Sequence, residues 1–179
     1  MKHLRSFLAF CAVVALAACD PVHSDEVSAL GGEAEGVPRG PLHRPGQPCT
    51  VCHDGALGDP PGFTIAGTVY QRPSDTTGLV NVTVNMLDKA GSCFSTTTNA
   101  AGNFYVTSRQ WTPTYPIVRT TAGGSGTCAP CAAGAGGRCV QMFSEIGWSG
   151  SCSSCHTQTS GPSSPGRVTL ALDDGGTPP

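Results

Sequence analysis

The chain has 179 residues, with 24 Gly, 15 Pro and 10 Cys, 12% charged side chains and a formal net charge of −2. This composition excludes a basic surface for nucleic acid, and no apolar stretch is long enough to span a membrane as a helix. A chain so rich in Gly and Pro, with only 6% aromatic residues, builds one modest core that covalent cross-links would have to support.

Residues 1–18 have the pattern of a bacterial export signal. Lys2 and Arg5 precede an apolar run of about a dozen residues, 7–18, which is too short to cross a bilayer. The run ends in Leu-Ala-Ala-Cys19, which resembles the lipobox of bacterial lipoproteins. The resemblance implies cleavage before Cys19 and acylation of that cysteine. The protein would then be lipid-anchored to the inner or outer membrane of the cell envelope, facing the periplasm or the exterior. The alternative is an ordinary secretory signal that leaves Cys19 a spare thiol.

Residues 19–48 comprise the lipidated Cys19 and a segment that mixes Pro, Gly and acidic residues without an apolar period. This pattern predicts a flexible tether with a root-mean-square span of about 30 Å. Loss of Lys2 and Arg5 with the signal leaves eight of the ten basic side chains against twelve acidic ones, so the exported chain is acidic.

The segment 49–61 opens with Cys49-Thr-Val-Cys52-His53, and the same pattern returns as Cys152-Ser-Ser-Cys155-His156. Cys-x-x-Cys-His resembles the haem-attachment site of c-type cytochromes. The resemblance implies two covalently bound haem c groups, each joined by thioethers to the two cysteines of a motif, with His53 or His156 as an iron ligand. One Cys-x-x-Cys alone would equally suit a disulfide or a metal pair. Two copies, each followed directly by His in a chain with five histidines, favour haem.

Residues 62–122 alternate apolar and polar side chains with the period of β-strands. One such run contains Val80, Val82, Val84 and Met86, which assigns Met86 to the core rather than to an iron. With the turns expected at 88–91 and 99–103, the pattern predicts a mainly β fold: a small antiparallel β-sandwich flanked by two irregular haem-binding segments.

Three stretches of this segment, 63–70, 80–84 and 97–104, resemble the carboxypeptidase regulatory-like, transthyretin-type β-sandwich. In that family the first strand carries a central Gly, and a Thr-x-x-x-x-Gly-x-Phe turn closes a later hairpin. The resemblance implies a structural or adhesive module and carries over no catalytic residues.

Residues 123–179 hold a Cys-rich loop, a short strand expected at 140–148, the second haem motif and a final strand at 166–172. Four cysteines remain outside the haem motifs and the export signal, an even number in an oxidising compartment. They predict two disulfides with three possible connectivities. These cysteines are Cys93, Cys128, Cys131 and Cys139.

A competing interpretation combines Cys128-x-x-Cys131 with Cys152-x-x-Cys155 as a four-thiolate zinc ribbon. It would leave Cys93 and Cys139 without partners and give His156 no role.

The second axial ligand of each haem iron would set its reduction potential. His43, shortly before the first motif, and Met142, shortly before the second, are the candidate distal ligands. Their alternatives are a solvated imidazole and a packed thioether, respectively. An iron with no distal ligand would favour small-molecule binding or peroxide chemistry.

The motifs together favour a membrane-anchored dihaem cytochrome that transfers single electrons between extracytoplasmic redox partner proteins. No catalytic residue is assigned, and no nucleic-acid partner is expected. Two alternatives belong to other classes: a small haem peroxidase or sensor, which needs an open iron and acid/base groups, and a structural β-sandwich in which haem serves as a staple.

Overall fold

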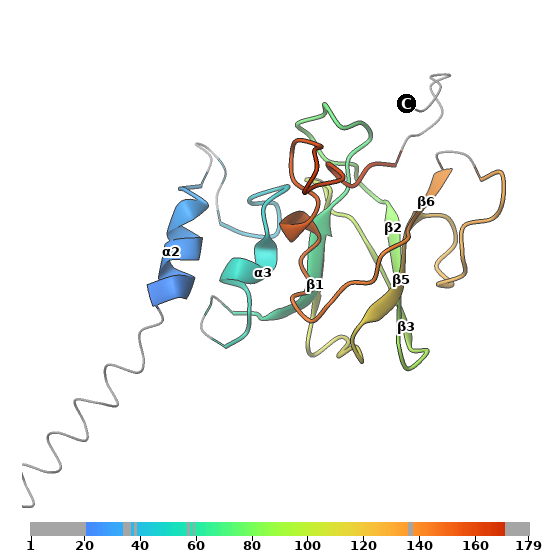
Figure 1. Ribbon diagram of the computed structural model, residues 1–179, viewed down its shortest axis with the longest axis horizontal. Helices are drawn as coiled ribbons and strands as arrows, with labels where there is room; N and C mark the ends of the chain where they lie inside the picture. The colour runs from blue at the N-terminus through green and yellow to red at the C-terminus, as the bar shows by residue number, and fades with distance from the viewer. Residues whose placement is uncertain are drawn as a thin grey trace, which may run out of the picture. The chain divides into compact units, whose positions relative to one another are not determined.

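The computed structural model describes residues 21–33, 37, 39–56, 58, 60–135 and 138–170 (Figure 1). The chain divides into two compact units, residues 1–32 and residues 33–179. The first unit contains one described helix, α2 (Pro21–Ala29). The predicted export signal and Cys19 lie outside the described residues. Within the described ranges, no helix combines the length and apolar character needed to cross a membrane.

The second unit is a β-sandwich of two antiparallel sheets. In the smaller sheet β1 (Phe63–Thr68) pairs with β4 (Asn103–Thr107). The larger sheet has the order β3-β2-β5-β6. Its strands are β2 (Thr83–Asp88), β3 (Cys93–Thr97), β5 (Ile117–Gly123) and β6 (Cys139–Met142). The predicted mainly β fold is therefore confirmed.

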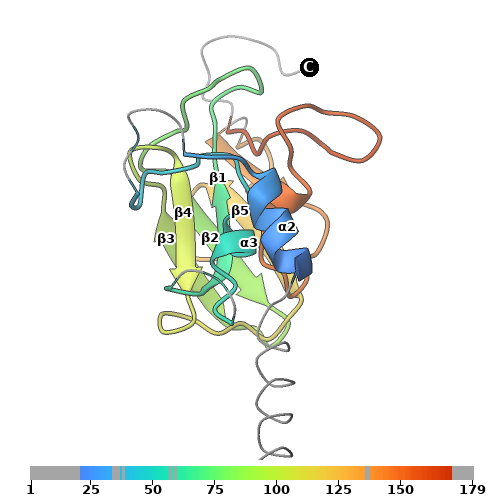
Figure 2. The same ribbon diagram turned by 90° about the vertical axis from the view of Figure 1, so that its left-hand side faces the viewer.

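The core fills the space between the sheets. Figure 2 shows β1 and β4 lying over β2, β3 and β5, and fully buried side chains from both sheets meet there. Met86 is one of them, with no exposed surface, as the strand pattern predicts. Each such aliphatic side chain contributes about 1.5–3 kcal/mol by leaving water. The other fully buried aliphatic side chains are Ile65, Val69, Val84, Val106 and Ile117.

The second edge of β1 is covered by segments from the C-terminal part of the chain. The amide of Ala66 donates to Gly150 O (2.9 Å), the amide of Tyr70 donates to Val168 O (2.9 Å), and the amide of Leu170 returns a bond to Tyr70 O (2.8 Å). This pairing explains why β1 is buried along most of its length rather than on alternate residues. Of the strand predicted at 166–172, residues 166–170 are described, and among them it is reduced to this short parallel bridge, in which Thr169 pairs with Tyr70.

Two further predictions need correction. Residues 41–47, assigned to a flexible tether, are hydrogen bonded to the sandwich: Gly46 N donates to Thr68 Oγ1 (2.7 Å), and Asn103 Nδ2 donates to His43 O (3.0 Å). Because these backbone groups form hydrogen bonds with the sheet, the segment is held in place, although its composition alone predicts a flexible chain. The strand predicted at 140–148 ends at Met142, and among residues 143–148 only Ile146 forms a β-bridge, to Ile117.

Candidate functional site

Both Cys-x-x-Cys-His motifs form a short helical turn, α-helical in the first and a 3₁₀ helix in the second. The first is α3 (Cys49–Cys52), in which the amide of His53 donates to Cys49 O at 2.9 Å. The second is η2 (Cys152–Ser154), in which the amide of His156 donates to Cys152 O at 2.8 Å. A helical turn brings positions three and four apart onto one side of the chain. Each motif is thus wound so that its two cysteines and its histidine belong to one turn.

Both turns pack against β1. α3 precedes the strand directly and contacts it, as Figure 1 shows, and the amide of Phe63 donates to His53 O at 2.8 Å. η2 contacts the same strand from the C-terminal side of the chain, immediately after the pairing of Ser151 with Ala66. One strand therefore positions two motifs that lie a hundred residues apart in the sequence.

Two glycines allow the second motif to approach β1 closely. Gly67 lies in the strand, and a Cβ there would come within 2.8 Å of Cys152 Cβ and 3.0 Å of Cys152 Sγ. Gly150 has φ +59°, and a Cβ there would lie 2.0 Å from Thr64 O. Since real side chains do not fit at such distances, both positions depend on glycine.

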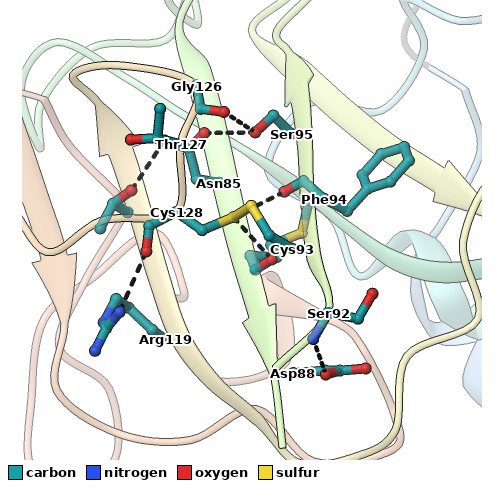
Figure 3. The surroundings of a disulfide bond; sticks show 12 residues. Asn85, Asp88, Ser92, Cys93, Phe94, Ser95, Arg119, Gly126, Thr127 and Cys128 are labelled. Carbon is teal, nitrogen blue, oxygen red and sulfur yellow. Dashed lines mark hydrogen bonds between the residues drawn. A yellow bond between two sulfur atoms is a disulfide. The ribbon is translucent and has the colours of Figure 1, made fainter. Parts of the chain in front are cut away.

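The remaining four cysteines form the predicted two disulfides. Cys93 pairs with Cys128, which ties β3 to the loop after β5 (Figure 3), and Cys131 pairs with Cys139. The structure thereby selects one of three connectivities. It also contradicts the zinc ribbon, because Cys128 and Cys131, two of its four ligands, are occupied in different disulfides.

The four motif cysteines are not disulfide bonded. Burial raises the pKa of Cys49 to about 11, helped by Cys52. Burial likewise raises the pKa of Cys152 to about 12, with further contributions from Cys49 and Cys155. Thiols of redox enzymes have lowered pKa values and react as thiolates. At neutral pH these two stay protonated, which is the opposite of an activated thiol–disulfide catalyst.

His156 is held in an orientation suited to a metal ligand. Its Nδ1 lies 2.8 Å from Gly166 O, and since a carbonyl only accepts, Nδ1 carries the proton and donates. The tautomer so defined leaves a lone pair on Nε2, the arrangement typical of metal-binding histidines whose other nitrogen is fixed by backbone.

His156 lines an apolar cavity of about 180 Å³ between the sheets. Cys152 and the candidate distal ligand Met142 line the same cavity, with Val69 and Phe104 among its apolar walls. The structure therefore brings together three of the side chains that the sequence proposes for the second haem. A polar cavity of about 170 Å³ adjoins it and shares His156, Arg167 and Val168.

At the first motif, the ring of His53 stacks on Phe63 with centroids 4.4 Å apart, and His43 lies 5.9 Å from His53, again between centroids. The two imidazole rings are inclined at 48° to each other. His43 Nδ1 contacts the backbone of Gly40, where it lies 3.3 Å from the amide N and also near the carbonyl O. The fold thus brings the predicted distal histidine to the predicted proximal one.

The donor sets fit haem c in their chemistry, since each motif offers an imidazole and two thiols that are not disulfide bonded. Neither cavity reaches the roughly 300–1,000 Å³ of pockets that enclose a ligand. We therefore expect a bound macrocycle to remain partly exposed. Within the described residues, no cluster of three or more His, Cys, Asp or Glu side chains is arranged to hold a metal ion.

Sequence reasoning missed the contribution of Arg167, Tyr70 and the two close-packing glycines. Gly67 within a strand pattern is a signal of close backbone approach, and it could have been used. Comparison of the chain with protein-family models, with curated proteins and with solved structures found no match in any of the three.

Proposed function

We propose that this protein is a dihaem c-type cytochrome that transfers single electrons between extracytoplasmic redox partners. The observation that carries the proposal is the division of the cysteines. Four form disulfides with each other, whereas the four in Cys-x-x-Cys-His motifs are not disulfide bonded and lie on two short helical turns against one strand.

In this proposal each motif holds one haem c, a cofactor that supplies reversible one-electron chemistry when bound. Cys49 and Cys52 hold the first and His53 ligates it. Cys152 and Cys155 hold the second, and Gly166 O fixes the tautomer of its ligand His156. His43 and Met142 are the distal candidates, supported by their places beside His53 and in the cavity of His156.

Electron transfer is favoured over peroxidase chemistry by the side chains around His156. Peroxidase catalysis needs an acid/base group beside an open iron. Neither described cavity has Asp or Glu in its lining, and His156, the histidine common to both, is assigned to the iron. A distal Met142 would also fill the position that peroxide needs.

We also propose a lipid anchor and a structural role for the β-sandwich. The Leu-Ala-Ala-Cys19 sequence supports lipid anchoring in a bacterial envelope, and the sandwich supports a carboxypeptidase regulatory-like scaffold that holds the two motifs. Covalent haem then stabilises a small core in addition to its redox role.

The test is covalent haem content after expression with a c-type maturation system. Intact mass should exceed that of the apoprotein by two haems, and acid–acetone extraction should leave the colour with the protein. Cys152→Ser with Cys155→Ser should remove one haem. The control is the double variant Cys131→Ser with Cys139→Ser. It removes a cysteine pair that no histidine follows, so it should retain both haems. Wild-type protein without covalent haem would refute the proposal.

A further inference from the structure

Arg167 is a half-buried cation with no acidic partner among the described residues. Its Nη1 donates to the backbone oxygens of Pro73 (3.3 Å) and Asp75, and its guanidinium lies 4.5 Å from the centroid of the Tyr70 ring. The ion pair found in the described part of the chain joins Arg44 to Glu33 instead. Carbonyl oxygens and an aromatic face hold Arg167 in place without neutralising its charge.

The polar cavity beside Arg167 is suited to an anion. Its lining combines this guanidinium with hydroxyl and amide side chains and contains no carboxylate, although the Thr68 hydroxyl already donates to Asn103 Oδ1 (2.8 Å). A planar guanidinium with donors free on one side is the usual partner of a carboxylate. The neutral polar side chains in the lining are Gln47, Thr68, Tyr70, Ser153 and Gln158.

This polar cavity adjoins the apolar cavity through His156, Arg167 and Val168, which line both. A haem has the same division of polarity, since its macrocycle is apolar and two carboxylates project from one edge. The proposed iron ligand, His156, lies at the boundary between the two environments.

We propose that the cavity around Arg167 is the carboxylate site for the haem held by Cys152 and Cys155, receiving its propionate edge, while the apolar cavity lined by Met142 faces the macrocycle. This inference rests on the proposed function. It adds Arg167 as a cofactor-positioning residue and fixes the direction in which the second haem faces.

The charge of Arg167 gives the proposal a measurable consequence. A cation beside the propionates offsets negative charge near the iron and so favours the reduced form, in which the iron carries less positive charge. Arg167→Gln should therefore lower the reduction potential of the second haem only. Arg167→Lys, which keeps the charge but not the planar fork, should lower it less. The control is Arg109→Gln at an exposed arginine, which should leave both potentials unchanged.

The experiment is a spectroelectrochemical titration of the full chain, repeated with Cys49→Ser and Cys52→Ser so that the second haem reports alone. Resonance Raman spectra should show the propionate bending band displaced in Arg167→Gln and unchanged in Arg109→Gln. Unchanged potential and Raman band in Arg167→Gln, with haem still attached, would overturn this inference and leave the proposed function intact. Absence of haem at the second motif in the wild type would overturn both.

A free anion is the rival occupant of the same cavity, and inorganic phosphate is the probe that separates the two. If a propionate fills the site, added phosphate should not change the potential of the wild type at constant ionic strength. A phosphate-dependent potential that disappears in Arg167→Gln would show that the cavity takes free oxyanions, and it would refute the haem assignment.

Discussion

Replacing Gly67 with Ala tests whether close packing of the second motif against β1 is required. The new Cβ would lie 2.8 Å from Cys152 Cβ, 3.0 Å from Cys152 Sγ and 3.0 Å from Phe104 Cε1. Cys152 and Phe104 are both buried, so neither can turn into solvent to make room. Overpacking of this kind costs about 1–3 kcal/mol. Ala also lowers the conformational entropy of the unfolded chain relative to Gly, which stabilises the folded state by about 0.4–1 kcal/mol. We therefore expect a net loss of about 1–2 kcal/mol in the free energy of unfolding.

The matched control is Gly147→Ala, which adds the same methyl group shortly before the second motif. No atom lies within 4 Å of a Cβ at that position, and its φ lies outside the left-handed region. This variant should be as stable as the wild type or slightly more so. Urea unfolding of the two variants side by side measures the difference, and 1.4 kcal/mol corresponds to about a tenfold change in the unfolding equilibrium.

The Gly67→Ala variant should also lose haem selectively. Its methyl group displaces Cys152, so attachment at the second motif should fall while attachment at Cys49 and Cys52 persists. Mass spectrometry of the proteolytic peptides measures each motif separately. Equal stability of the two alanine variants, or equal loss of haem at both motifs, would refute the packing argument.

Three further predictions concern cross-links, acid stability and the first iron. Loop-closure entropy predicts that Cys93–Cys128, with a sequence separation of 35, contributes about 4 kcal/mol, and that Cys131–Cys139, with a separation of 8, contributes about 2.5 kcal/mol. Unfolding of the two double-Ala variants should rank them in that order. The amides of Thr114 and Ser92 donate to Asp88 and lower its pKa from 3.8, so its stabilisation is present above that value and is lost as the pH falls through the depressed pKa. In Asp88→Asn, the free energy of unfolding should accordingly fall less steeply as the pH is lowered. An unchanged dependence on acid pH would contradict this role of Asp88. His43→Ala should create a high-spin fraction and carbon monoxide binding at one haem only, whereas an unchanged spectrum would exclude His43 as the distal ligand.

The strands were predictable because apolar and polar side chains alternate along a strand of which one face is buried in the core. The pattern failed at Val80, which was expected to share the face of Val82, Val84 and Met86 but is 53% exposed. Asn81, between them, has φ +59°, a left-handed conformation that Asn tolerates better than most residues. That conformation breaks the extended chain, so β2 begins only at Thr83 and the side chain of Val80 turns outward.

The thiol pairs of the candidate site were predictable from spacing, but their environment was not. Spacing defines which residues share a turn, and it identified both motifs. The apposition of Arg167 to Tyr70 and of His43 to His53 depends on pairing between segments far apart in the chain, which local patterns do not encode. The disulfide connectivity likewise follows from where β3 and the loop after β5 meet.

The placement of both motifs on β1 has a consequence for electron transfer. Residues 45–47, just before Cys49, line the same polar cavity as Ser153 and His156, and Cys49 contributes to the raised pKa of Cys152. Groups attached to these two motifs would be neighbours within one small domain. An electron added to one haem would then repel an electron added to the other, because the protein interior screens charges less than water does. The proposed dihaem carrier would then accept its second electron less readily than its first, which would suit passage of single electrons from one partner to the next rather than delivery of two at once.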